Sequence, residues 1–294
     1  MKISKIISAS FMLLSIGVTA QNGSDSLGLP GDNLNLSGVL ELFKKSDNPE
    51  EFEKALNKED NKINNLDLNG DGEIDYLRVV DHSKEDAHAL VIQVPVNETE
   101  SQDVAVIEIE KNGNEAAQVQ IIGDEDLYGK NYIVEPVGEN VKSAESSSEV
   151  NKTIVVVNVW AWPSVRYIYR PSYVVWTSPW KWRYYPVWWK PWKPVHWHVY
   201  HPHWHHHHHY HHRVHVHRVV KAHNVYYGHR KVSKTVYQKR TPGKTGSVKQ
   251  GRKNHNQVSK NPGKQRVKGT SGKRQGQKSG RSGKGAGQKS GRRK

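Results

Sequence analysis

The acidic residues of this chain all lie in its first half, which limits how the rest can fold. All 29 Asp and Glu residues fall between Asp25 and Glu149, and the last 145 of the 294 residues contain none. Residues 21–152 carry 11 basic and 29 acidic side chains, a net charge of −18, whereas residues 153–294 carry 31 Lys and Arg. A globular domain usually mixes its signs, so this division predicts at least two bodies with different roles.

Residues 1–20 have the pattern of a secretory signal peptide. Two lysines precede an apolar run, and Val18-Thr19-Ala20 provides the small residues that a signal peptidase needs. An uncleaved anchor is the alternative, but the run is about half the roughly twenty residues that a bilayer span requires. The chain has no Cys, so neither disulfides nor a lipidated N-terminal Cys can form. We therefore expect export to the periplasm, the cell surface or the extracellular medium.

A change of hydrophobic period predicts a small α+β domain at residues 34–137, after a polar leader at 21–33. Apolar residues at helical spacing predict helices at 36–45 and 49–57, the second with Asn48 as its N-cap. The period then becomes two, which predicts short strands over residues 74–81, 87–94, 104–111 and 117–122. Two short helices packed on a small antiparallel β-sheet are the expected architecture.

The remaining chain divides by composition into a linker, an arm and a tail. Residues 138–152 are a polar linker, and residues 153–230 form an arm that holds all ten Trp and fifteen of the eighteen His. Residues 153–160 are suited to a fifth strand, but the seven Pro between residues 160 and 204 exclude long helices and central strands there. Residues 231–294 are rich in Lys, Arg and Gly and have little to bury, so we expect a disordered basic tail.

The nine residues from Asp67 to Asp75, DLNGDGEID, have the oxygen spacing of a calcium loop. The loop resembles an EF-hand loop over these nine residues, but Arg78 stands where that family has a bidentate Glu. It is closer to the DxNxDGxxD loops of dockerins and FG-GAP-type repeats. The resemblance implies Ca²⁺ ligands from Asp67, Asn69, Asp71, Asp75 and the carbonyl of Glu73. The alternative is an Asx/Gly turn whose acids are merely solvated.

The His-rich part of the arm offers ligands for a transition metal. Closely spaced neutral imidazoles bind Zn²⁺, Ni²⁺ or Cu²⁺ at several weak sites. No acid or Cys lies nearby in the sequence to complete a site of fixed geometry. The alternative is a pH-sensitive aromatic surface. The candidate ligands are His196, His198, His201, His203, His205, His206, His207, His208, His209, His211, His212, His215 and His217.

The aromatic and basic residues of the arm have three interpretations: a second buried core, contact with lipid headgroups at a membrane surface, and stacking on sugars or bases. The tail either binds a polyanion by counterion release or folds back on the acidic domain. In an exported protein the polymer would be lipopolysaccharide, an acidic polysaccharide or extracellular DNA, and we expect no small-molecule substrate. The candidate contact residues are Trp188, Trp189, Trp192, Lys190, Lys193, Arg213 and Arg218.

The stretches NNLDLNGDGEIDYLRVVD, VQIIGDEDLYGKNYIVEP and VVVNVWAWPSVRYIY resemble an uncharacterised group of exported bacterial proteins with an acidic N-terminal domain that carries this loop. The resemblance implies export and the limits of the domain. The chain has no phosphate loop, GxSxG, HExxH or Cys nucleophile, so we expect no enzyme. The leading hypothesis is an exported protein that adheres to anionic polymers through its C-terminal half and has a calcium-stabilised N-terminal domain. The alternative is transition-metal sequestration by the His-rich segment.

Overall fold

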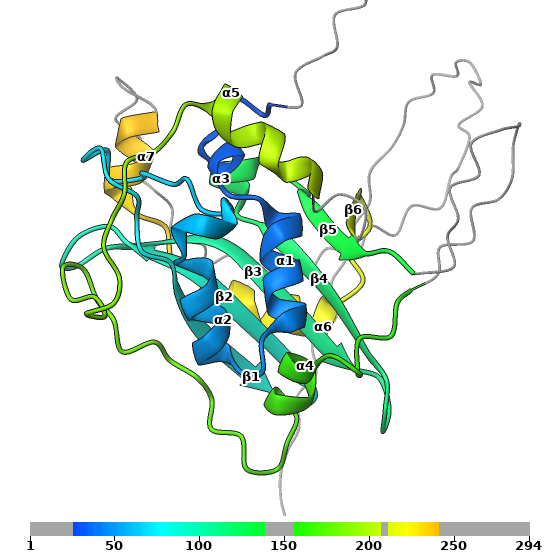
Figure 1. Ribbon diagram of the computed structural model, residues 1–294. Coiled ribbons are helices and arrows are strands. Elements are labelled where there is room, and N and C mark those ends of the chain that lie inside the picture. Colours follow the sequence, from blue (N-terminus) through cyan, green and yellow to red (C-terminus); the bar gives the residue numbers. More distant parts are fainter. Residues whose placement is uncertain (1–25, 139–155, 207–210, 241–294) are drawn as a thin grey trace, which may run out of the picture. The chain divides into compact units, whose positions relative to one another are not determined.

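The computed structural model describes residues 26–138, 156–206 and 211–240 (Figure 1). The chain divides into two compact units, residues 1–252 and 253–294, and every described residue belongs to the first. In the described part, no helix combines the length and the apolar character that crossing a bilayer requires. The predicted signal peptide, most of the linker and residues 241–294 of the tail lie outside the described residues.

A six-stranded antiparallel sheet forms the centre of the fold. Its strands lie side by side in chain order, and every neighbouring pair is antiparallel. The strands are β1 (Arg78–Lys84), β2 (Ala87–Pro95), β3 (Ser101–Lys111), β4 (Ala117–Gly123), β5 (Ile133–Pro136) and β6 (His211–Val214). The predicted α+β class and the predicted antiparallel sheet are therefore confirmed.

Three helices cover one face of the sheet: α1 (Leu36–Lys45), α2 (Pro49–Leu56) and α4 (Pro163–Ile168) (Figure 1). The side chain of Asn48 accepts a hydrogen bond from the backbone of Glu51, so the predicted cap starts α2. Apolar side chains from these helices and from the sheet form one core, whose fully buried members include Phe43, Phe52, Leu56, Leu90, Ile107 and Ile121.

The opposite face of the sheet is covered by helix α6 (Val220–Tyr227), drawn behind the strands in Figure 1. Side chains alternate between the two faces of a strand. In β3, Ile107 and Ile109 therefore enter the main core, while Val106 packs with Tyr226 of α6. Glu108 lies two residues after Val106, on the same face of the strand, and is also buried. The second face is thus partly apolar and partly acidic.

The remaining helices are short and lie at the edges of these two layers. They are α3 (Glu125–Tyr128), α5 (Trp197–Tyr200) and α7 (Lys234–Arg240), with 3₁₀ helices at Pro30–Asn33, Glu59–Asn61 and His201–His206.

The described part of the predicted arm is built into the fold, which corrects the expected division between domain, arm and tail. Strand β6 extends the sheet beyond β5, and Trp162 and Val165 are buried in the same core as α1. Val236 of α7 is buried there as well, so residues 231–240 are not part of a disordered tail. The physical reason is that the acidic sheet presents buried carboxylates, and the basic segment supplies their donors.

Two predicted strands differ from the structure. The run at 74–81 becomes a strand only at Arg78, because earlier amides bind elsewhere: Ile74 donates to the carbonyl of Trp192, and Leu77 donates to the side chain of Asn57. The fifth strand is Ile133–Pro136 and not residues 153–160. Residues 153–155 lie outside the described part, and residues 156–160 form no strand.

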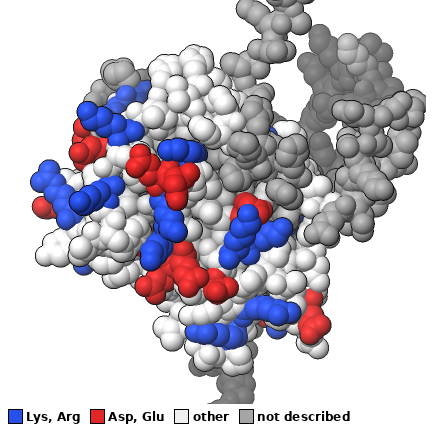
Figure 2. Space-filling view, viewed as in Figure 1, with Lys and Arg blue, Asp and Glu red and all other residues white. Residues whose placement is uncertain are grey.

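The charges that are separated along the chain are mixed in the fold. The described ranges contain 23 Lys and Arg and 25 Asp and Glu. Figure 2 shows the two signs next to one another on the face that it presents. Residues 241–294 contain 17 Lys and Arg and no acid. The described ranges therefore carry a net charge of −2, and the whole positive excess of the chain belongs to residues outside them.

A candidate metal centre beneath helix α6

Glu108 of β3, His217 and His223 come together between the sheet and α6. The carboxylate Oε2 of Glu108 lies 2.6 Å from Nε2 of His217, and its Oε1 lies 2.9 Å from Nδ1 of His223. The two imidazole rings meet edge to face with their centroids 4.4 Å apart. Among the described residues, this is the one group of three or more His, Cys, Asp or Glu whose ligand atoms all lie within 4.8 Å of one another.

The segment that carries the two histidines is fixed to the sheet by its backbone. The backbone amide of Arg218 donates to the side chain of Gln120, which lies opposite Glu108 in the β3–β4 register. The side chain of Glu110 accepts hydrogen bonds from the amides of Lys221 and Ala222 at the start of α6. A carboxylate is favourable at a helix N-terminus. These contacts hold both histidines over Glu108.

The electrostatics of this group follow from the burial of its carboxylate. The Glu108 side chain is 0% exposed, whereas both imidazoles are partly exposed. Burial lowers the pKa of His223, but the hydrogen bond that the imidazole donates to Glu108 and the negative charge of Glu108 outweigh burial, so the net effect raises that pKa. A buried carboxylate is costly without a charged or hydrogen-bonding partner. The two imidazoles supply that partner.

The same three side chains can hold a metal ion. Two imidazole nitrogens and one carboxylate oxygen are donors that suit Zn²⁺, and three protein ligands leave one tetrahedral position for water or another ligand. The partly exposed imidazoles give an ion a route from solvent, while the buried carboxylate supplies negative charge in a region of low dielectric.

Of the predicted metal ligands, only His217 belongs to this centre. No acid lies near the histidines along the sequence, but the fold brings Glu108 beside them. Glu108 is 109 residues away from His217 in the chain. His212 lies 3.4 Å from Glu135, His211 is buried in β6, and His196 stacks on His198. The side chains of His205 and His206, and residues 207–209, lie outside the described part.

Sequence reasoning missed Glu108 and His223. The signal for Glu108 was the alternation VIEIEK, which places its acids on the face opposite the main core. Nothing in that pattern says which segment covers this face. His223 is the last histidine of the His-rich stretch that begins at His196, but it was not among the predicted ligands.

The predicted calcium loop is closed by its own hydrogen bonds. Asp67 accepts from the amides of Gly70, Asp71 and Gly72, and Asp75 accepts from the amide of Leu68 and from Asn69. The side chain of Asn69 accepts from the amide of Asp71, and the side chain of Asp71 accepts from the amide of Glu73. This is the geometry of the Asx-turn alternative.

Asp75 is the buried member of the loop. Its burial, together with the charges of Asp67 and Asp71, raises the pKa of Asp75 to about 7. A cation bound here would relieve that repulsion. Ca²⁺ binding therefore stays a prediction, and the hydrogen bonds show that the loop can close on its own.

The predicted polymer-contact residues separate into two groups. Trp188, Trp189, Lys190 and Trp192 line one cleft of about 550 Å³, together with Asn57, Lys58, Glu59, Asp60 and Lys62. Lys193 is exposed and does not line it. Arg213 lies over the ring of Tyr132, and Arg218 forms an ion pair with Glu135 at 2.9 Å. The last two arginines thus contact the protein's own domain.

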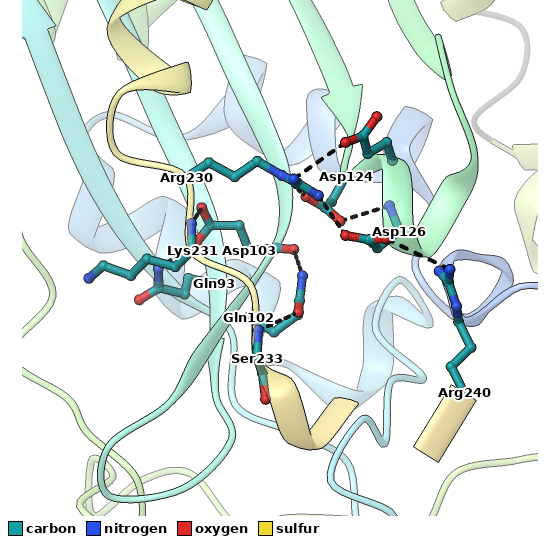
Figure 3. A network of polar contacts seen from close by, with 10 residues as sticks. Gln93, Gln102, Asp103, Asp124, Asp126, Arg230, Lys231, Ser233 and Arg240 are labelled. Atoms are coloured by element: carbon teal, nitrogen blue, oxygen red, sulfur yellow. Dashed lines mark hydrogen bonds and ion pairs between the residues drawn. The ribbon is translucent and has the colours of Figure 1, made fainter. Parts of the chain in front are cut away.

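A second polar network joins the other end of this basic segment to the sheet. Figure 3 shows the guanidinium of Arg230 directed at Asp124 and Asp126, and Arg240 reaching Asp126 from α7. The charged atoms of Arg230 lie 2.7 Å from Asp124 and 2.8 Å from Asp126. Asp103 accepts hydrogen bonds from Gln93 and from the amide of Lys231. The network anchors residues 230–240 to β3 and to the start of α3.

No family model, curated protein or solved structure matches this chain. Function is therefore inferred from its own residues. The resemblance to exported bacterial proteins stays a prediction.

Proposed function

We propose that this protein is an exported, non-catalytic metal-binding protein whose principal site consists of Glu108, His217 and His223. One observation carries the proposal: two histidines from a distant part of the chain converge on the two oxygens of one fully buried carboxylate. The chemistry of the donors favours Zn²⁺, and Ni²⁺ and Cu²⁺ are the nearest alternatives.

A bound ion would also stabilise the fold, because its ligands come from β3 and from the segment that leads into α6. At a hundredfold excess over Kd, a ligand that binds only the folded state adds about 2.7 kcal/mol to the free energy of unfolding. The exposed histidines of the arm would add weaker sites with no fixed geometry. Metal handling would then combine one defined centre with several interchangeable ones.

Calorimetric titration of the full-length chain with Zn²⁺ tests the proposal. We expect one tight equivalent, followed by weaker ones. His223→Ala should abolish the tight equivalent, and the matched control His198→Ala should retain it, because His198 is exposed and stacks only on aromatic neighbours. Equal losses in the two variants would assign the binding to the His run as a whole and contradict a defined centre.

A second candidate function is adhesion to anionic polymers through the basic tail. The observation that favours it is the charge balance: 23 basic and 25 acidic residues nearly cancel in the described ranges, whereas residues 241–294 add 17 basic residues and no acid. Because such binding is driven by counterion release, the logarithm of the binding constant falls linearly with the logarithm of the salt concentration. A full-length variant with these 17 residues changed to Gln should lose most of that slope on lipopolysaccharide, polygalacturonate and duplex DNA. An unchanged slope would contradict a role for the tail.

Calcium binding by the Asp67–Asp75 loop is a separate proposal for the stability of the domain. The raised pKa of Asp75 supports it, since a cation would offset the charges of Asp67 and Asp71. The spacing of oxygens that resembles dockerin and FG-GAP loops supports it as well.

A further inference from the structure

The cleft that contains Trp188 and Trp192 has features of a binding site that the metal centre does not use. It is formed by two segments far apart in the chain, the turn after α2 and the Pro-rich part of the arm. Trp188 is 47% exposed, which is high for so large an apolar ring. Trp189 is buried, and its indole nitrogen has no hydrogen-bond partner among the described residues.

The walls of this cleft are held in place by the core of the protein. The ring of Trp189 packs edge-on against Tyr76, at 5.1 Å, and against Tyr185, at 4.6 Å. Tyr76 is fully buried and donates a hydrogen bond to Glu53 of α2. The carbonyl of Trp192 accepts from the amide of Ile74, which ties the arm to the chain that leads into β1. The aromatic residues therefore have a fixed position.

The cleft places aromatic surface beside cations and hydrogen-bond acceptors. Lys58, Lys62 and Lys190 contribute three positive charges, while Glu59 and Asp60 contribute two carboxylates. Lys54 reaches the ring of Trp188 at 5.7 Å, so that indole is already flanked by one cation. Aromatic rings that lie beside a few fixed polar groups are typical of ligand sites.

We infer that this cleft binds a short stretch of an acidic polysaccharide. The apolar face of a hexose ring would pack on Trp188 and Trp192, and its carboxylate or sulfate would pair with the lysines. Glu59 and Asp60 favour a sugar over a nucleic acid, because carboxylates accept hydrogen bonds from many hydroxyls but repel closely spaced phosphates. The inference rests on the proposed contact with anionic polymers and supplies a site for it in the folded part of the chain.

Binding of a hexamer of galacturonic acid to the full-length protein, measured by calorimetry, tests this inference. We expect Trp188→Ala and Trp192→Ala each to weaken binding at least tenfold, and Lys190→Gln to reduce its salt dependence. The matched control is Trp182→Ala, whose ring lies under Arg183 and does not line the cleft. Neutral cellohexaose and a hexamer of thymidylate should each bind the variant with the neutralised tail at least tenfold more weakly than the acidic sugar does.

The outcomes separate the cleft from the tail. If Trp188→Ala binds the hexamer as the native chain does, while the variant with a neutralised tail loses binding, the cleft inference is overturned and adhesion through the tail stands. If thymidylate binds the variant with the neutralised tail as tightly as galacturonate does, the cleft selects anions and not sugars, which also overturns the inference. If neither the cleft nor the tail changes affect polymer binding, both ideas fail. Trp188 is half exposed, so its replacement should leave the circular dichroism spectrum unchanged.

Discussion

Replacing Arg230 with Met should destabilise the whole fold, although residue 230 lies more than a hundred residues from its partners in the sequence. Asp124 is 0% exposed and Arg230 is 16% exposed, and their charged atoms are 2.7 Å apart. Removal of one partner from a buried ion pair typically costs about 3–5 kcal/mol, since the other charge is left without compensation. The contact with exposed Glu125 adds no more than about 1 kcal/mol. We therefore expect a loss of about 3–5 kcal/mol in the free energy of unfolding.

The loss should depend on pH in a definite direction. Burial raises the pKa of Asp124 to about 6 even with Arg230 beside it. Without Arg230 that pKa should rise further, so Asp124 is neutral in the folded variant at pH 5. At pH 8 the folded variant must either hold an unpaired buried charge or keep a proton that the unfolded chain has lost, and both cost stability. Because the folded state then binds more protons than the unfolded state, stability falls as pH rises. The difference in the free energy of unfolding between the variant and the native chain should be smaller at pH 5 than at pH 8.

Urea unfolding of full-length Arg230→Met and of the double variant Arg230→Met/Asp124→Asn measures these effects. Asn keeps the acceptor that caps α3 but carries no charge, so the double variant should recover at least half of the loss. A loss below about 1 kcal/mol in Arg230→Met, or a double variant no more stable than the single one, would mean that this segment does not complete the fold.

Two further predictions concern carboxylates of the acidic domain. Burial raises the pKa of Asp103 to about 6, so between about pH 4 and 6 the folded state binds more protons than the unfolded state and stability falls as pH rises. In urea titrations, Asp103→Asn should flatten this fall. A pH profile of stability that is the same in the variant and the native chain would count against a buried charge at Asp103. Addition of Ca²⁺ should raise the melting temperature of the native chain but not that of Asp71→Ala, and a calcium-independent transition in both would leave the Asp67–Asp75 segment as an Asx turn alone.

The sequence was sufficient for the elements whose signals are local. Helix α1 begins and ends at the predicted residues, and Asn48 caps α2 as expected. Strands β2 to β4 were predicted because each carries an alternating or apolar run that can be recognised without its partners. Strand β5, with only four residues, and strand β6, which reads HHRV, have no such signal. Their pairing depends on an edge that forms only when the rest of the sheet exists.

The candidate centre could be predicted only in part for a related reason. His217 belonged to a His-rich run, and metal binding by that run was an expected function. The missing ligand was an acid on β3, and local pattern cannot show that its face is covered by chain from residue 211 onward. The separation of charge along the chain was the available clue: carboxylates that are buried in one half need donors, and the other half holds most of them.

The coordination shell of Zn²⁺ in the full-length protein, measured by X-ray absorption at one equivalent of metal, tests the central claim most directly. The proposed centre predicts two imidazole nitrogens and one carboxylate oxygen at about 2.0–2.2 Å, with a further oxygen, from water, in the fourth position. Glu108→Gln should change that shell, and His198→Ala should leave it unaltered. A shell of three or four imidazoles that is the same in all three proteins would place the metal in the His run and contradict the account.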